Sequence, residues 1–172
     1  MRWLWIDRVI SIEPGERLVA VKSVSLAEEH LHDHFAADDH GDALPVMPGS
    51  LVVEGIAQSA GILVGHAEGF RDNVILAKLN KVSLERDATP GCTIRYTATI
   101  TQRSPMGASA TVTAEILDHG DADRGYVPLG EADLVFSHLP NSSDEIPEHN
   151  FVFGEQFRTL LRTSGVTWDQ PA

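Results

Sequence analysis

A single acidic side chain interrupts a long apolar run near the middle of the chain. Residues 51–64 are Leu, Val, Ile, Ala and Gly, except for Glu54, Gln58 and Ser59. A helix that is apolar on all sides is normally buried in a protein core. Because glutamate is rarely buried without a partner or a function, and burial favours the protonated form of a carboxyl group, Glu54 is a candidate proton donor.

The segment before this run could supply a base and an anion-binding backbone. His34 lies upstream, and the sequence Pro-Val-Met-Pro-Gly at residues 45–49 leads directly into the predicted helix. Gly49 would then lie at the helix N-terminus, where backbone N–H groups and the positive end of the helix dipole favour an oxyanion. An imidazole, a carboxyl group and such a backbone are the groups needed to remove a proton beside a thioester carbonyl.

Gln58 is the second polar residue of the run that could take part in this chemistry. It lies four residues after Glu54, so the two side chains share one face of a helix. Its amide could donate a hydrogen bond to the Glu54 carboxyl group and orient it. The same amide could instead satisfy a backbone group, and the sequence leaves both roles open.

These residues together resemble the signature of a known family, the bacterial 3-hydroxyacyl-acyl carrier protein dehydratases of the FabZ/FabA type. Three motifs carry the similarity: His34-Phe35, Pro-Val-Met-Pro-Gly at 45–49, and Leu-Val-Val-Glu-Gly-Ile-Ala-Gln at 51–58. The fixed spacing of the glycine, the glutamate and the glutamine makes the pattern specific. The resemblance covers roughly residues 3–139, and it implies a hotdog fold, in which an antiparallel sheet wraps around one long helix.

The resemblance also implies a reaction. A (3R)-3-hydroxyacyl thioester, carried on the phosphopantetheine of acyl carrier protein or on coenzyme A, would become a trans-2-enoyl thioester and water in fatty-acid or related lipid synthesis. His34 would remove the C2 proton, Glu54 would protonate the departing hydroxyl group, and the Gly49 N–H would bind the thioester oxygen. The residues expected to contact the substrate are Phe35, Met47, Gly49 and Gln58.

By the same resemblance, no metal or redox cofactor is expected, because elimination of water needs only a base, an acid and polarisation of the carbonyl. The active site is expected at a dimer interface, where His34 of one subunit faces Glu54 of the other. The expected assembly is a homodimer or a trimer of dimers. Three basic residues could contact the acidic carrier or could simply be solvated strand ends: Lys78, Lys81 and Arg86.

The sequence departs from the family pattern between the two catalytic groups. In the family the histidine stands about five residues before the first Pro of Pro-Val-Met-Pro-Gly, whereas His34 stands eleven residues before Pro45. The inserted segment, within residues 36–44, is rich in Asp, and such side chains are costly to bury. We therefore expect it to bulge outward and leave His34 in place. If the insertion displaces His34, His40 becomes the candidate base.

Three other interpretations remain open. A hotdog thioesterase would use the helix carboxylate to activate water, and a non-catalytic hotdog subunit would only bind an acyl carrier or a catalytic partner. Neither of these requires His34. A metal site is the third, since imidazole and carboxylate groups are common ligands. Its candidate ligands are His30, His32, Asp33, His34, Asp38, Asp39, His40 and Asp42.

Composition limits the class of protein. With 172 residues the chain is long enough for one domain with a substantial core. The formal net charge of −12 argues against a nucleic-acid-binding surface. The single cysteine, Cys92, cannot form an internal disulfide. Neither a membrane-spanning apolar stretch nor a targeting segment is recognised, so a cytoplasmic protein that does not insert into membranes is expected.

Hydrophobic alternation predicts an antiparallel sheet around the central helix. Residues 93–101 and 110–116 alternate apolar and polar side chains, which indicates strands with one buried and one solvated face. Further strands are predicted at 5–12, 17–26, 74–84 and 130–139. The α+β class follows, with a hotdog domain at residues 1–139. Residues 140–172 are predicted to be a linker and a short extension with a helix at 151–161.

Overall fold

The computed structural model describes residues 3–34, 37, 41–139 and 152–167 of the chain. Strands dominate this part of the chain, with one long helix between β2 and β3. The elements in chain order are β1 (Arg8–Glu13), β2 (Arg17–Ser23), α1 (His30–Asp33), α2 (Gly49–Ala67), β3 (Asn73–Leu84), β4 (Cys92–Ser104), β5 (Gly107–Asp118), the 3-10 helix η1 (His119–Arg124), β6 (Val127–Leu139) and α3 (Glu155–Thr163).

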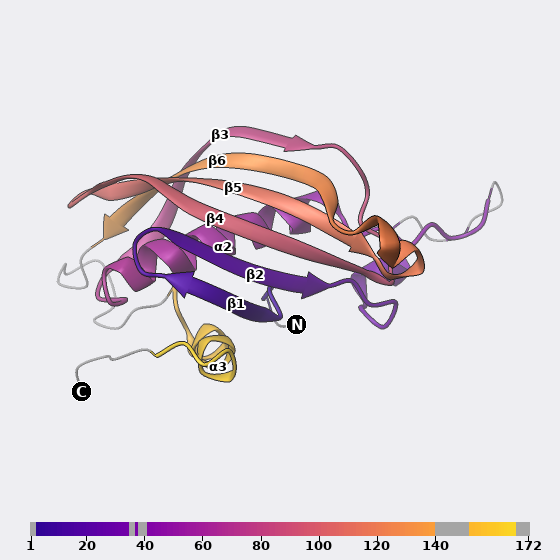
Figure 1. Cartoon of the computed structure of the whole chain (residues 1–172), viewed down its shortest axis with the longest axis horizontal. Helices are drawn as coiled ribbons and strands as arrows, with labels where there is room; N and C mark the ends of the chain where they lie inside the picture. The colour runs from indigo at the N-terminus through magenta and orange to yellow at the C-terminus, as the bar shows by residue number, and fades with distance from the viewer. Residues whose placement is uncertain (1–2, 35–36, 38–40, 140–151, 168–172) are drawn as a thin grey trace.

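The strands form one antiparallel sheet in the order β1-β2-β4-β5-β6-β3. The central helix α2 packs against this sheet and contacts five of its strands, β2 to β6. In Figure 1 the sheet curves over α2, and β1 and β3 lie at its opposite edges. The predicted α+β arrangement, an antiparallel sheet wrapped around one long helix, is confirmed.

The side-chain alternation that predicted β4 and β5 is present in the structure. On β4, Ile94, Tyr96 and Ala98 are completely buried, while the Thr and Arg residues between them are partly exposed. The hairpin between β1 and β2 turns at Gly15, which has a φ of 74°, a conformation that glycine adopts without steric cost. Local sequence therefore determines which face of the sheet meets α2.

The central helix is longer than the predicted apolar run and lies in the core. Ile56, Ile62 and Leu63 are completely buried. A Cβ atom added to Gly55 would lie 2.4 Å from the Tyr96 hydroxyl oxygen, so glycine permits the close approach of helix and sheet. By length and composition α2 could cross a membrane, which the sequence analysis did not anticipate, but most of it is buried, as expected of a core helix.

The histidine-rich segment before α2 is helical rather than extended. Residues His30–Asp33 form α1. The backbone of this segment is therefore not a strand, on which alternate side chains would point to the same side.

The C-terminal segment packs on the domain rather than apart from it. Helix α3 lies beside β1 (Figure 1), within a region where a short helix was predicted. Phe153, Leu160 and Leu161 are buried and belong to the same hydrophobic cluster as α2 and the sheet. The described part of the extension therefore shares the core of the hotdog domain.

Candidate active site

Gln58 connects Glu54 to the N-terminal segment of the chain. Its Nε2 donates hydrogen bonds to Glu54 Oε1 over 2.9 Å and to the Trp3 carbonyl oxygen over 3.2 Å. Its Oε1 accepts a hydrogen bond from the Trp5 backbone N–H over 2.8 Å. Both roles that the sequence left open are therefore present, because one amide holds Glu54 and also satisfies two backbone groups.

Glu54 lines a mostly apolar cavity of about 400 Å³ beside α2. Its side chain is partly exposed, which corrects the expectation of full burial: α2 turns this face toward the cavity instead of toward the sheet. Among the described residues that line it, Gln58 adds a side-chain amide and Trp3 an indole N–H. The remaining lining residues are Ala57, Gly61, Val74, Ile75, Leu76, Phe136, Val152, Phe153 and Phe157. An apolar cavity with few polar groups is typical of a small-molecule site.

The N-terminus of α2 is formed by the Pro-Val-Met-Pro-Gly segment. Pro48 is the N-cap residue, and its carbonyl oxygen accepts hydrogen bonds from the N–H groups of Leu51 and Val52. The N–H groups of Gly49 and Ser50 precede these bonds and point out of the helix end, as the first N–H groups of any helix do. Because Gly49 is exposed, an oxyanion could reach this end of α2.

His34 is held beside the same segment. Its imidazole Nδ1 lies 2.7 Å from the Val46 carbonyl oxygen. A carbonyl oxygen can only accept a hydrogen bond, so Nδ1 carries the proton and the lone pair of the neutral ring lies on Nε2. His34 therefore has the tautomer in which Nε2 can act as a base.

The structure brings some of the predicted site residues together and separates others. Glu54 and Gln58 share the cavity, whereas His34, Met47 and Gly49 do not line it. Met47 is 1% exposed and belongs to the core, where its backbone N–H donates to the Ala88 carbonyl oxygen over 2.8 Å. The backbone of Met47 therefore ties the loop before α2 to the segment between β3 and β4.

Two residues of the predicted site region, Phe35 and His40, lie outside the described residues, as do Asp38 and Asp39 of the insertion. The prediction that the insertion bulges outward can therefore be examined only at its described residues, Ala37, Gly41, Asp42, Ala43 and Leu44, and all five are exposed. Within the part of the chain that is described, His, Cys, Asp and Glu side chains do not form a group of three or more suited to a metal ion.

His30 is the upstream histidine that contacts the Gln58 network through an aromatic ring. Its ring packs edge-to-face on Trp5, with the ring centroids 5.1 Å apart. Burial lowers the pKa of His30, partly offset by the nearby Glu28 carboxylate, so the neutral ring is favoured. From the sequence, His30 was assigned no role beyond that of a possible metal ligand.

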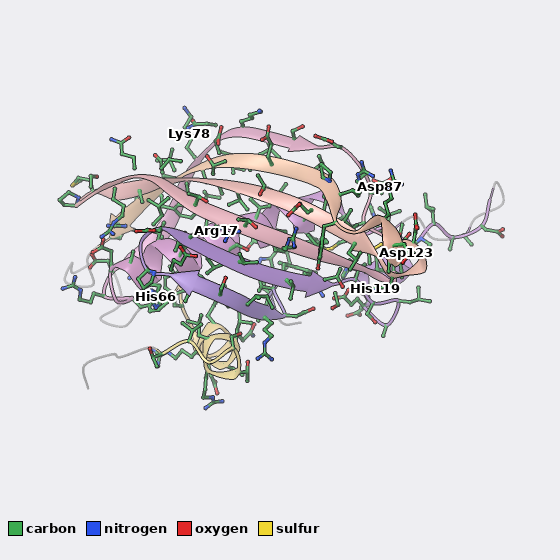
Figure 2. All side chains as sticks on the ribbon, in the orientation of Figure 1. Arg17, His66, Lys78, Asp87, His119 and Asp123 are labelled. Carbon is green, nitrogen blue, oxygen red and sulfur yellow. The ribbon has the colours of Figure 1, made fainter. Side chains whose placement is uncertain are left out.

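The basic residues near β3 are partly neutralised. Lys81 pairs with Glu131 on the neighbouring strand β6, and this hydrogen bond raises the pKa of Lys81. Figure 2 shows Lys78 at the β3 edge of the sheet, well separated from Asp87. Lys81 therefore does not add an uncompensated positive charge to a patch with Lys78 and Arg86.

Several residues that line the cavity or bind Gln58 were not predicted as site residues. Trp3 and Trp5 bind Gln58 through backbone atoms, which leave no signal in the sequence. Val152, Phe153 and Phe157 come from the C-terminal segment, about 100 residues away from Glu54. The aromatic residues of this segment were a visible signal, but nothing in the sequence connected them to α2.

Comparison with known proteins agrees with the motifs around α2. Residues 1–122 match the model of the family described as the FabA-like domain. A curated relative, the 3-hydroxyacyl-[acyl-carrier-protein] dehydratase FabZ of Listeria monocytogenes, is 34% identical over 141 residues, covering 80% of this chain and 88% of the relative.

Solved structures share the architecture at lower identity. A thioesterase family protein from Silicibacter pomeroyi has a TM-score of 0.59 and 14% identity, covering 77% of this chain and 84% of that protein. AziG of S. sahachiroi has a TM-score of 0.54 and 17% identity, covering 77% of this chain and 90% of AziG. These likenesses, together with the sheet that wraps α2, show the hotdog fold. The chain belongs to the FabA-like family.

Proposed function

We propose that this protein dehydrates (3R)-3-hydroxyacyl thioesters to trans-2-enoyl thioesters. The observation that carries the proposal is the pairing of Glu54 with Gln58 on the wall of an apolar cavity, within the residues that match the FabA-like family model. The carboxyl group can meet a polar reacting centre while the apolar lining receives a hydrocarbon chain. The name of the FabZ relatives, 3-hydroxyacyl-[acyl-carrier-protein] dehydratase, supports acyl carrier protein as the carrier of the substrate. We also propose that the enzyme acts in the cytoplasm, in fatty-acid or related lipid synthesis.

In the proposed reaction, protons balance over one turnover. Nε2 of a histidine removes the C2 proton, the C2–C3 double bond forms, and the C3 hydroxyl group departs with a proton from Glu54 as water. The histidine then holds one additional proton and Glu54 lacks one, and transfer between them restores the starting state. These steps require no metal or redox cofactor, since each side chain acts only as an acid or a base.

His34 is the proposed base, and the 2.7 Å contact of its Nδ1 with the Val46 carbonyl oxygen supports Nε2 as the reacting atom. His40 is the alternative, because it stands five residues before Pro45, the spacing of the family motif. Comparing turnover of His34→Ala and His40→Ala distinguishes them. If turnover falls by a factor of about 10² or more in only one of the two variants, the histidine replaced in that variant is the base.

The N-terminus of α2 is proposed to polarise the thioester carbonyl. The exposed N–H of Gly49 and the positive end of the helix dipole would stabilise the negative charge that develops on the thioester oxygen. This negative charge develops while His34 removes the C2 proton. The Gly49 N–H and His34 would therefore act in the same step.

The proposed active unit is a homodimer, with assembly to a trimer of dimers as the larger alternative. Edge strand β3 carries four exposed apolar residues, Leu76, Leu79, Val82 and Leu84. An open edge with apolar side chains favours pairing with another strand. A second subunit on this edge would lie next to the cavity wall formed by residues 74–76, from where it could supply the base.

The main alternative function is that of a thioesterase. The thioesterase family protein from Silicibacter pomeroyi shares the fold of this chain, and the fold alone does not distinguish the two activities. The two activities differ in product, because hydrolysis releases the carrier thiol and dehydration does not. We would incubate purified protein with 3-hydroxybutyryl and 3-hydroxydecanoyl carrier thioesters and follow enoyl thioester and free thiol in the same tubes.

The proposal predicts enoyl thioester with thiol release at the background rate. Thiol release without enoyl product would indicate a thioesterase. Absence of both products, with binding of the carrier thioester retained, would indicate a non-catalytic subunit. The Glu54→Gln variant serves as the control for activity from contaminating enzymes.

A further inference from the structure

The cavity beside α2 is formed by two parts of the chain that are far apart in sequence. Glu54, Ala57, Gln58 and Gly61 line one side of it. Their spacing places them on one face of the helix, along a rise of about 10 Å. The cavity therefore runs along α2 away from Glu54, and the polar side chains that α2 contributes to it are those of residues 54 and 58.

The C-terminal segment supplies three of the other lining residues, Val152, Phe153 and Phe157. The Phe153 ring lies against Gly65, one turn beyond Gly61, where an added Cβ atom would be 2.7 Å from the ring. Phe153 also packs edge-to-face on Phe70 and Phe157, with centroid distances of 4.9 and 5.8 Å. These rings stand at the end of the α2 face that is distant from Glu54.

The segment that carries these rings is fixed to the domain at several points. The Val152 backbone N–H donates to Asn73 Oδ1 over 3.4 Å at the start of β3. At the other end, Ser164 Oγ accepts a hydrogen bond from the Val9 backbone N–H over 3.0 Å. Leu160 and Leu161 are buried between these points. The segment that carries the rings of Phe153 and Phe157 is therefore attached to the domain at both ends, and the two rings form a fixed part of the cavity wall.

We propose that residues 152–167 close the acyl-chain site and limit the length of acyl chain that the enzyme accepts, with Phe157 as the specificity-determining residue. The inference rests on the proposed function for the identity of the occupant, an acyl chain whose thioester lies near Glu54. It goes beyond the family match, which ends at residue 122. Phe157 is the suitable position to vary, because it is only partly buried, whereas Phe153 is part of the core.

The test measures kcat/KM for 3-hydroxybutyryl, 3-hydroxydecanoyl and 3-hydroxyhexadecanoyl carrier thioesters. Phe157→Ala is expected to raise the hexadecanoyl-to-butyryl ratio about tenfold or more, because opening a hydrophobic pocket by a few methylene volumes changes selectivity by that amount. Phe157→Trp is expected to lower the decanoyl-to-butyryl ratio. Arg162→Ala is the matched control, since Arg162 is an exposed residue of α3 that does not line the cavity, and its ratios should equal those of wild type.

Binding of fatty acids separates this inference from the proposed function. By titration calorimetry, wild-type protein is expected to bind decanoate more tightly than hexadecanoate, and Phe157→Ala is expected to reverse that order. If no thioester is dehydrated, the proposed function fails and the calorimetry alone decides whether the C-terminal segment limits the site. Unchanged length preference in both folded Phe157 variants, by turnover and by binding, overturns the inference. Phe157→Leu replaces Phe157→Ala if the latter does not fold.

Discussion

At the scale of single residues, the orientation of the Gln58 amide determines what Glu54 can do. The Trp5 backbone N–H can only donate, so the atom of Gln58 that faces it must be Oε1. Nε2 is then directed at Glu54 Oε1, 2.9 Å away, and that oxygen must accept. A proton on Glu54 is consequently carried by Oε2. The hydrogen-bond network thus selects which carboxyl oxygen donates to a substrate.

The first prediction concerns this donor. Glu54→Gln should fold like wild type, because the side chain is partly exposed and keeps its size, but it cannot give up a proton. Turnover should fall by about 10² to 10⁴, the usual contribution of a general acid. Glu16→Gln, an exposed change in the β1–β2 turn, is the matched control. More than about a tenth of wild-type turnover in Glu54→Gln would exclude Glu54 as the acid.

The second prediction concerns Gln58 itself. Gln58→Ala removes the acceptor for the Trp5 N–H and the donor for Glu54. A buried N–H without a partner costs about 1–3 kcal/mol, so the free energy of unfolding should fall by that amount and Tm by several degrees. Urea unfolding and calorimetry measure the two quantities. Unchanged stability would mean that water replaces the amide, and the network would then not be structural.

At the scale of elements, two glycines of α2 face different surroundings. Gly55 faces Tyr96, with 2.4 Å between an added Cβ atom and the hydroxyl oxygen, and 3.0 Å to the Trp5 carbonyl oxygen. Gly61 faces the cavity, where the nearest atom, on Phe136, would be 3.7 Å from a Cβ atom. One glycine therefore allows the sheet to approach, and the other widens the cavity.

The third prediction contrasts these two positions with the same substitution. Gly55→Ala should lower the free energy of unfolding by about 1–3 kcal/mol, because overpacking forces side chains or backbone to move. Gly61→Ala should raise it by up to about 1 kcal/mol, through higher helix propensity at a site with room for a methyl group. Chemical denaturation of both variants measures the difference. Equal effects at the two positions would contradict the assignment of distinct roles.

At the scale of the whole molecule, the cavity of one chain contains Glu54 but not all of the proposed site residues. His34 and Gly49 do not line the cavity that contains Glu54. The two sheet edges also differ, since α3 lies beside β1 and its C-terminal turn bonds that strand, while β3 exposes apolar side chains. A second copy of the chain on the β3 edge would explain both observations.

The fourth prediction tests this arrangement. If the base and the acid come from opposite subunits, mixing inactive His34→Ala with inactive Glu54→Gln under subunit-exchange conditions should restore about a quarter of wild-type activity, because some mixed dimers contain one intact site. Each variant mixed with itself is the control. Continued inactivity, with exchange shown by mass spectrometry of tagged subunits, would indicate that each site lies within one chain.

The sequence alone predicted those features that depend on the pattern of neighbouring residues along the chain. Alternation specified the buried face of β4, because side chains on a strand point to opposite sides in turn. The apolar run specified a core helix, since such a run can only be stable when covered. The spacing of Glu54 and Gln58 predicted their hydrogen bond, because residues four apart are neighbours on a helix.

Contacts between distant segments were decided only by the tertiary structure. Trp3 and Trp5 bind Gln58 through a backbone carbonyl oxygen and a backbone N–H, groups that every residue except proline carries, so their identity carries no signal. The sequence also predicted full burial for Glu54, although α2 exposes that face to a cavity whose existence depends on where β3 and the C-terminal segment pack. Phe157 meets this cavity because chain folding brings α3 across the domain, and no local periodicity encodes such a contact.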